Sequence, residues 1–212
     1  MRIITGSARG TRLSTVEGEA TRPTADRVKE AIFSMIQFDI EGRRVLDLFG
    51  GSGQLALEAL SRGAARAVMV DSSKEAADVM TANAKKTHLY DRCRILTTYF
   101  STYLRGAAGT ETFDLIFLDP PYDSNFLPKA LRAILDGHFC APGATLICET
   151  DCDIPTRATR LRHDEEKTAE YVLRDVFGGD EELAAGYTVL KSNLYGRTRI
   201  TLLTPAGEEN AS

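Results

Sequence analysis

The feature that most restricts the fold of this chain is an apolar run that leads straight into a glycine turn and then a helix. The run at 45–49 is followed at once by Gly50, Gly51, Ser52 and Gly53. Leucine and alanine then recur at helical spacing over 55–60. Strand, glycine turn and helix together open the βαβ unit of nucleotide-binding α/β domains. The sequence therefore predicts such a unit at 44–60.

Strands and helices continue to alternate after this unit. Further strands are predicted at 67–71, 94–97, 113–118 and 145–149, and helices at 73–86 and 127–135. Alternation over about 100 residues predicts a mostly parallel sheet with helices on both faces, which is a Rossmann-like α/β fold. Beyond 150 the pattern weakens. We expect a short strand at 157–161, a helix at 166–177, a surface excursion at 178–182 and a late antiparallel strand at 198–203.

The N-terminal stretch 1–40 precedes this domain. It predicts a β-hairpin, with strands at 2–5 and 11–14 joined by a glycine-bounded turn at 6–10, and an amphipathic helix at 25–37 capped by Thr24. We expect residues 1–40 to form an extension, 41–204 the main domain and 205–212 a disordered tail. The hairpin of the extension is expected either to contact a polyanion or to be a solvated hairpin that covers a sheet edge. Arg9 is expected at the tip of the turn, and Arg22, Arg27 and Lys29 on the exposed side of the helix or near its start.

The charge of the chain is unevenly distributed. Its net charge is −4, but eight acids against Lys167 and Arg174 give the stretch 164–182 a charge of −6, which leaves +2 for the rest. This acidic stretch is expected to be an inserted excursion. Arg9, Arg12, Arg22 and Arg27 are then either candidates for contact with RNA phosphates or simply solvated side chains.

Cysteine and histidine residues argue against two classes of site. The four cysteines, without an export signal, do not suggest a disulfide framework. No cysteine or histidine spacing matches a metal site, so no metal is expected. Without a signal peptide or a long apolar segment, the protein is expected in the cytoplasm.

A short motif follows the strand predicted at 113–118. It consists of Asp119, Pro120, Pro121 and Tyr122. The prolines end the strand, so a carboxylate and an aromatic ring lie at the strand end where α/β sheets bind ligands. This arrangement suits a planar group that carries an NH2, although a simple turn with Tyr122 as packing would also explain it.

The glycine turn admits two cofactors. Gly51, Gly53 and Ala56 satisfy the dinucleotide fingerprint, and Asp71 lies eighteen residues after Gly53, where a ribose-binding acid belongs. However, Asp47, Phe49, Gly51 and Gly53 together resemble the D-x-F-x-G-x-G pattern of class I methyltransferases. S-adenosylmethionine needs an acid for its ribose, which Asp71 supplies, and benefits from negative charge near its sulfonium, which Asp47 supplies. The motif at 119–122 favours S-adenosylmethionine over a dinucleotide.

The order of the motifs resembles that of methyltransferases that act on exocyclic or amide nitrogens. In that class a glycine loop follows the first strand, an acid the second and [DN]-P-P-[YF] the fourth. The resemblance implies a seven-stranded class I methyltransferase fold. It also implies that Asp119 and the Pro120 carbonyl accept the amino hydrogens while Tyr122 stacks on the acceptor base, with Pro121 beside it.

More of the chain resembles one family, RsmD. The shared segments are 2–6, 9–10, 21–33, 45–53, 58–64, 119–122 and 195–198. The resemblance implies methylation of guanine N2 in 16S ribosomal RNA, within an assembled or partly assembled small subunit. The chain departs from the family in having Asp71 in place of glutamate and no acid at Thr98 or Tyr99, where the family contacts adenine.

Three alternatives stay open at this point. The first is a methyltransferase acting on DNA adenine N6 or on a protein glutamine. The second is a hydride-transferring enzyme that binds a dinucleotide. The third is a ribosome-assembly factor without catalytic activity.

Overall fold

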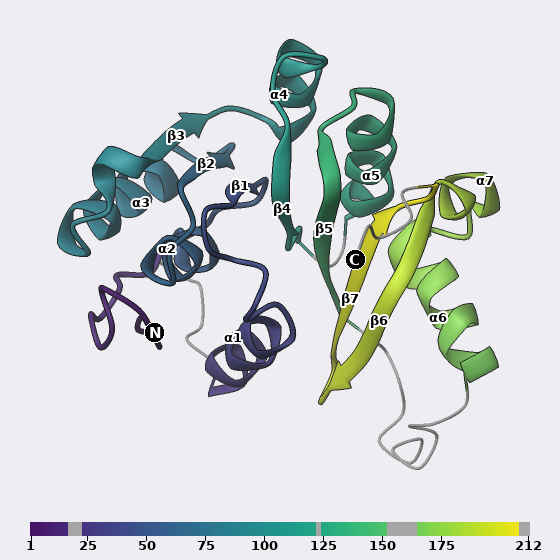
Figure 1. Cartoon of the computed structure of the whole chain (residues 1–212), viewed down its shortest axis with the longest axis horizontal. Coiled ribbons are helices and arrows are strands. Elements are labelled where there is room, and N and C mark those ends of the chain that lie inside the picture. The colour runs from purple at the N-terminus through teal and green to yellow at the C-terminus, as the bar shows by residue number, and fades with distance from the viewer. Residues whose placement is uncertain (17–22, 122–123, 152–164, 208–212) are drawn as a thin grey trace.

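The structure is a computed structural model, and it describes residues 1–16, 23–121, 124–151 and 165–207. Within these residues a seven-stranded sheet runs through the middle of the molecule (Figure 1). The strands are β1 (Arg44–Asp47), β2 (Arg66–Asp71), β3 (Cys93–Thr97), β4 (Phe113–Leu118), β5 (Cys140–Asp151), β6 (Tyr187–Tyr195) and β7 (Thr198–Pro205). The helices are α1 (Pro23–Met35), α2 (Gln54–Ser61), α3 (Lys74–Lys86), α4 (Phe100–Ala107), α5 (Phe126–Asp136), α6 (Glu165–Phe177) and α7 (Glu181–Ala185), with a 3-10 turn at Tyr90–Arg92.

The strand order in the sheet is β3-β2-β1-β4-β5-β7-β6. Neighbouring strands from β3 to β5 pair in parallel, while β7 pairs antiparallel with both β5 and β6. Because β1 lies between β2 and β4, the strand order reverses beside β1, and open α/β sheets bind ligands at such a reversal. The predicted Rossmann-like sheet is confirmed.

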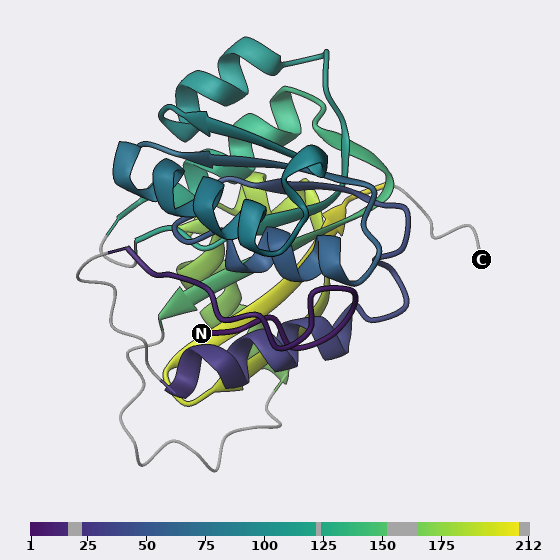
Figure 2. The same ribbon diagram turned by 90° about the vertical axis from the view of Figure 1, so that its left-hand side faces the viewer.

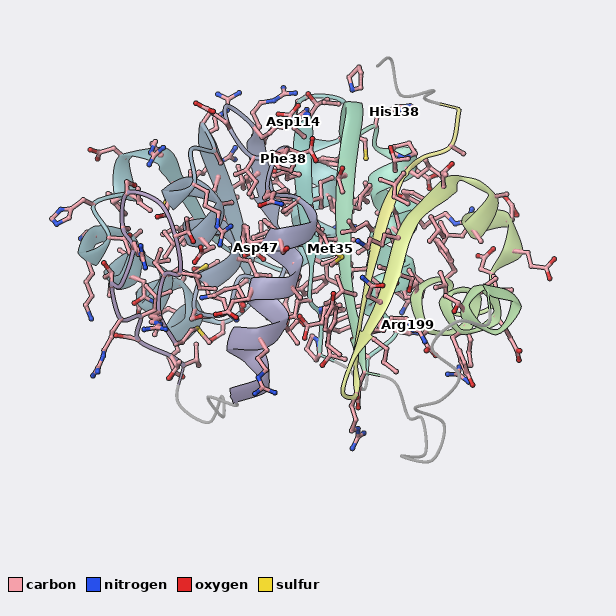
Figure 3. The ribbon with its side chains drawn as sticks, turned by 60° about the horizontal axis from the view of Figure 1, so that its bottom comes forward. Met35, Phe38, Asp47, Asp114, His138 and Arg199 are labelled. Atoms are coloured by element: carbon pink, nitrogen blue, oxygen red, sulfur yellow. The ribbon has the colours of Figure 1, made fainter. Side chains whose placement is uncertain are left out.

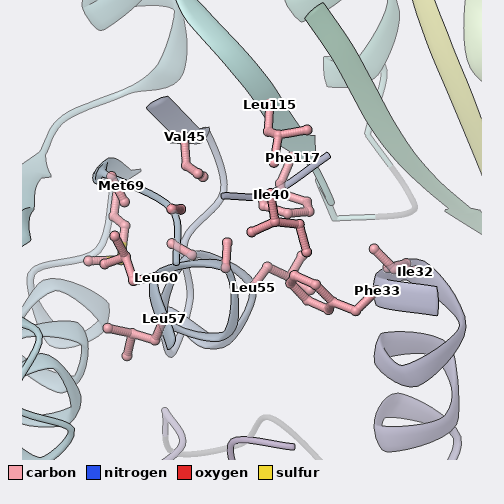
Figure 4. Close-up of a cluster of buried hydrophobic side chains, with 14 of the residues drawn as sticks. Ile32, Phe33, Ile40, Val45, Leu55, Leu57, Leu60, Met69, Leu115 and Phe117 are labelled. Atoms are coloured by element: carbon pink, nitrogen blue, oxygen red, sulfur yellow. The ribbon is translucent and has the colours of Figure 1, made fainter. Parts of the chain in front are cut away.

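Apolar side chains hold the helices on the two faces of the sheet. Leu115 and Phe117 of β4 point to the face covered by α1, α2 and α3, whereas Ile116 and Leu118 point to the face covered by α4, α5, α6 and α7. This alternation follows from the two-residue period of a strand. Figure 4 shows Phe33 of α1 between α2 and the strands, near Phe117. Helix α1 crosses the front of this face in Figure 3.

The N-terminal segment is attached to α2 through one buried carboxylate. Glu58 of α2 is fully buried, and its oxygens accept hydrogen bonds from the backbone N–H groups of Ile4 and Thr5 at 2.7 and 3.0 Å. Arg62 Nε donates to Glu58 at 2.8 Å, and Lys29 Nζ lies 3.9 Å from it. Figure 2 shows the N-terminal segment running alongside α1.

Two expectations for the stretch 1–40 were wrong. Lys29 is 1% exposed, because its ammonium donates to the Arg2 carbonyl at 2.5 Å and faces Glu58. Thr24 lies inside α1, which begins at Pro23. The expected pairing of 2–5 with 11–14 is present but short: besides the antiparallel bridge between Arg2 and Arg12, the Ile3 N–H donates to the Thr11 carbonyl at 3.0 Å and the Leu13 N–H to the Met1 carbonyl at 3.2 Å. Ile3 and Leu13 are buried, so the segment is held by packing as well as by this pairing.

The second half of the chain contains elements that the sequence did not predict. They are α4, α7 and the edge strand β6, and β5 is longer than expected. The acidic residues of α6 and α7 are carried by helices that bury Val172, Val176 and Leu183 against the sheet. Asp180 was expected in a surface excursion. Instead it caps α7, where its carboxylate accepts from the Leu183 N–H at 2.9 Å. The strand expected at 157–161 lies outside the described residues.

None of the helices in the described part of the chain has the length and apolar character needed to cross a membrane.

Candidate active site at the carboxyl edge of the sheet

Three acids predicted from the sequence lie at one edge of the sheet. Asp47 is the last residue of β1, Asp71 is the last of β2, and Asp119 follows the last residue of β4. In the strand register Asp47 is paired with Met69 of β2 on one side and with Phe117 of β4 on the other. Asp71 and Asp119 are each two residues beyond these partners, so both lie on the carboxyl side of Asp47.

The glycine turn that follows β1 needs its glycines for space and for backbone conformation. Gly53 has φ +76°, and a Cβ there would lie 3.2 Å from the side chains of Met69 and Met80. A Cβ at Gly50 would lie 2.6 Å from Met80 Sδ. The turn therefore packs directly against β2 and α3, which leaves backbone rather than side chains at its surface.

Asp71 connects the glycine turn to β2. Its carboxylate accepts hydrogen bonds from the Gly51 N–H at 2.9 Å and from the Ser73 N–H at 2.8 Å. Each carboxylate oxygen has a further lone pair, and the side chain is only half-buried. Asp71 can therefore accept hydrogen bonds from ligand hydroxyl groups while it keeps the turn in place.

Asp47 is a buried carboxylate with an unsatisfied oxygen. It is 1% exposed, and its Oδ1 has no hydrogen-bond partner among the described residues. Burial raises the pKa of Asp47 to about 7, against the lowering effect of the Ala56 and Phe49 N–H groups, and the charge of Asp71 raises it further. A buried acceptor of this kind suits a cationic ligand group, which would restore its negative charge.

We expect Asp47→Asn to stabilise the ligand-free protein at pH 8 by roughly 1–3 kcal/mol. The pKa of Asp47 is higher in the folded state than the ordinary value near 3.9 that it has when unfolded. Its unfavourable contribution therefore grows as the pH rises from about 4 to about 7 and stays complete above that range. Urea unfolding of both proteins between pH 5 and pH 8 measures this, and a stability difference that does not change with pH would contradict it.

The described part of the motif after β4 consists of Asp119, Pro120 and Pro121. Asp119 is half-buried, Pro120 is buried and Pro121 is exposed. The Pro121 carbonyl accepts hydrogen bonds from the backbone N–H and the hydroxyl of Ser124, at 3.1 and 2.6 Å. The motif thus presents Asp119 and Pro120 at the carboxyl edge, while Tyr122 lies outside the described residues.

An aromatic cluster that the sequence did not reveal lies beside the glycine turn. The ring of Phe49 lies 5.3 Å from that of Phe100 and 6.4 Å from that of Phe126. Tyr99, which is 68% exposed, precedes Phe100 at the start of α4. Tyr99, Phe100 and Phe126 border a groove of about 610 Å³ between α4 and α5. The helical spacing of Tyr103, Leu104 and Ala107 in the sequence could have predicted α4, the helix that carries Phe100.

The arginines of the N-terminal extension are not gathered at this edge. Arg9, Arg12 and Arg27 are exposed, and Arg22 lies outside the described residues. The turn that carries Arg9 is bonded to Ser61, at the opposite end of α2 from the glycine turn. Because α2 has eight residues, this end lies about 12 Å from its start. Contact between Arg9 and RNA stays a prediction and would occur away from the three acids.

Comparison with known proteins agrees with the arrangement of this edge. A family model described as conserved hypothetical protein 95 matches residues 1–174. The Bacillus subtilis (strain 168) protein YlbH, whose name assigns it provisionally to the rRNA methyltransferases, is 44% identical over 64% of this chain and 74% of its own length. Ribosomal RNA small subunit methyltransferase D of Haemophilus influenzae is 32% identical over 73% of this chain and 81% of its own length.

Relatives from Escherichia coli match more of the chain. The protein of strain K12 with the name ribosomal RNA small subunit methyltransferase D is 30% identical over 81% of this chain and 86% of its own length. A solved Escherichia coli structure, yhhF, superposes with a TM-score of 0.73 over 97% of both chains at 24% identity, and it shows the shared fold. The matched family and these relatives lead to one conclusion: the chain belongs to the RsmD family of methyltransferases.

Proposed function

We propose that this protein transfers a methyl group from S-adenosylmethionine to the exocyclic N2 of a guanine in small-subunit (16S) ribosomal RNA. The observation that carries the proposal is the placement of Asp47, Asp71 and Asp119 at one sheet edge, around the glycine turn. Relatives named ribosomal RNA small subunit methyltransferase D support ribosomal RNA as the substrate. An assembled or partly assembled small subunit is the proposed form of that substrate.

The residues at the edge fit this cofactor. Asp71 has acceptor capacity left for the ribose hydroxyls, and the unsatisfied Oδ1 of Asp47 suits a cationic group. Gly50 and Gly53 let the backbone of the turn pack directly against Met69 and Met80, and neither residue has a side chain that a ligand at the turn would have to avoid. Bound there, S-adenosylmethionine would supply an electrophilic methyl carbon attached to a sulfonium.

Asp119 and Pro120 would hold the acceptor. The lone pair of an exocyclic amine on guanine is delocalised into the ring, so the amine is a weak nucleophile. The Asp119 carboxylate and the Pro120 carbonyl would accept hydrogen bonds from its two N–H groups and orient the lone pair toward the methyl group. On transfer the bond from sulfur to the methyl carbon breaks as the bond to nitrogen forms, S-adenosylhomocysteine leaves, and the nitrogen gives up one proton to Asp119 or to water. Rate acceleration then comes mainly from position and fixed charge. Tyr122 is proposed to stack on the base, which contributes about 1–3 kcal/mol.

We expect the affinity for S-adenosylmethionine to fall about tenfold for each pH unit below 7. The carboxyl of Asp47 has a pKa of about 7 before binding, so binding of a cation beside it requires loss of its proton. Calorimetry in buffers of different ionisation enthalpy should detect proton release at pH 6. Asp47→Asn should bind weakly with a flatter pH profile. Equal affinity of the wild-type protein at pH 6 and pH 8 would contradict this use of Asp47.

A labelling experiment tests the proposed function. The protein and methyl-labelled S-adenosylmethionine are incubated with one candidate substrate in each reaction. The substrates are small subunits from a strain that lacks this protein, naked ribosomal RNA, DNA and a release factor. Label in small subunits or naked RNA, recovered as N2-methylguanine after digestion, is the expected result. Label in DNA adenine or in glutamine, or no label in any substrate, would refute the proposal in favour of a different acceptor or a non-catalytic assembly role.

A further inference from the structure

A small cavity lies beside Pro120 on the side of the sheet that carries α5 and α6. Its volume is about 270 Å³, and it lies between the two prolines of the motif, the end of β5, the start of α5 and α6. Pockets for drug-sized ligands are larger as a rule, so a cavity of this size suits one planar heterocycle better than a whole nucleotide. Because Pro120 and Pro121 line it, a base whose amino group reaches Pro120 lies next to this cavity.

The cavity contains an unsatisfied buried hydroxyl. Thr150, near the end of β5, lines it and is 7% exposed, and its Oγ1 has no hydrogen-bond partner among the described residues. Thr150 is two residues beyond Cys148, which is buried on the side of α5 and α6, so by strand alternation its side chain points to the side of the cavity. A buried hydroxyl without a partner is costly for the fold, and a bound polar ligand would remove this cost.

The charges around the cavity indicate the kind of ligand. The described lining includes the acids Glu149, Asp151 and Asp175 and one cation, Arg174, whose Nε lies 2.6 Å from Asp175. Arg197, which does not line the cavity, pairs with Asp151 at 2.9 Å. Because acids outnumber cations in the described lining, the cavity disfavours a phosphate and favours a group with several N–H donors. The Watson–Crick edge of guanine is such a group, since it carries N1–H and the two N2 hydrogens.

From these observations we propose that the cavity receives the target base and that Thr150 is a specificity-determining residue whose hydroxyl accepts or donates a hydrogen bond at the edge of that base. The inference rests on the proposed function and deepens it, since it names the residue that selects the base. Thr150 does not take part in the transfer of the methyl group. It helps to position the amine at Asp119 and Pro120.

Replacement of Thr150 by valine tests this. Valine keeps the shape and removes the hydroxyl. We expect Thr150→Val to lower kcat/KM for the RNA substrate at least tenfold, with an unchanged affinity for S-adenosylmethionine and a Tm equal to or above that of the wild-type protein. Thr150→Ser, which keeps the hydroxyl, should stay within about threefold of the wild-type kcat/KM.

Thr201 provides a matched control. It is a fully buried threonine of the neighbouring strand β7, in register with Cys148, but its hydroxyl is paired with that of Ser192 at 3.1 Å. Thr201→Val should therefore lower Tm and leave kcat/KM within about twofold. The inference is overturned if Thr150→Val has wild-type kinetics, if Thr150→Ser loses as much activity as Thr150→Val, or if Thr150→Val lowers Tm as Thr201→Val does. If the wild-type protein labels no RNA, the proposed function fails instead, which is a separate result.

Discussion

Replacing Asp119 by alanine should lower methyl transfer by about 10²–10³-fold and leave the affinity for S-adenosylmethionine within about twofold of the wild-type value. A preorganised group at the reacting centre contributes about this much to the rate. Asp119 follows β4, whereas the glycine turn and Asp71 belong to the β1 and β2 ends, so cofactor binding does not depend on its carboxylate. Single-turnover transfer to the labelled RNA and calorimetric titration with S-adenosylhomocysteine measure the two properties separately.

Two control variants identify what the carboxylate does. Asp119→Asn keeps one oxygen acceptor but removes the charge, so its rate should lie between those of the wild-type and alanine proteins. Asp114 lies on the same strand at its opposite end, where it pairs with Arg44 at 2.9 Å (Figure 3). Asp114→Asn should reduce stability and leave the transfer rate within about twofold. Transfer by Asp119→Ala at more than a tenth of the wild-type rate would exclude the proposed role of Asp119.

Glu58→Gln should lower the free energy of unfolding by about 3–5 kcal/mol, because it removes a buried negative charge that faces a buried cation and accepts three hydrogen bonds. In the wild-type protein the carboxylate accepts from Ile4, Thr5 and Arg62 and faces Lys29, which is 1% exposed. The amide of glutamine has only one acceptor oxygen, so one backbone N–H or Arg62 loses its partner. Lys29 keeps its hydrogen bond to the Arg2 carbonyl but loses the negative charge that lies 3.9 Å away. For a chain of 212 residues the expected change in Tm is on the order of 10 °C.

Two further variants compare the buried pair of Glu58 and Lys29 with a solvent-exposed ion pair. Lys74 and Asp78 form an exposed pair at 2.8 Å on α3, and Asp78→Asn should change stability by less than about 0.5 kcal/mol. Adding Lys29→Met to Glu58→Gln should recover part of the lost stability, because no uncompensated charge then remains buried. Urea unfolding measures the free energy of unfolding of the wild-type protein, the two single variants and the double variant. If Glu58→Gln costs no more than Asp78→Asn, Glu58 does not hold the N-terminal segment in place.

The local pattern of the sequence was sufficient to predict the parts of the site that lie on strand ends. Asp47, Asp71 and Asp119 each follow an apolar run, and the carboxyl ends of parallel strands lie at one edge. The sequence predicts Ser72 or Ser73 as the cap of the helix that follows β2, and the structure has Ser73, which accepts from the Ala76 N–H at 3.3 Å. These predictions succeeded because a strand, a glycine turn or a helix cap depends on residues that are close together in the chain.

The pairing of Lys29 with Glu58 and the cluster of Phe49, Phe100 and Phe126 are contacts that only the tertiary structure decided. Lys29 is a cation in a polar stretch of the sequence, so local patterning placed it on the surface. Its partner lies on another helix, beyond the first strand and the glycine turn. The hydroxyl of Thr150 is equally inconspicuous in the sequence, and only the packing of α5 and α6 leaves it buried without a partner among the described residues beside Pro120. Local sequence thus determined which residues stand at the sheet edge, because strand and turn formation is local. Which buried polar groups find partners was decided by the tertiary structure, because such partners come from distant parts of the chain.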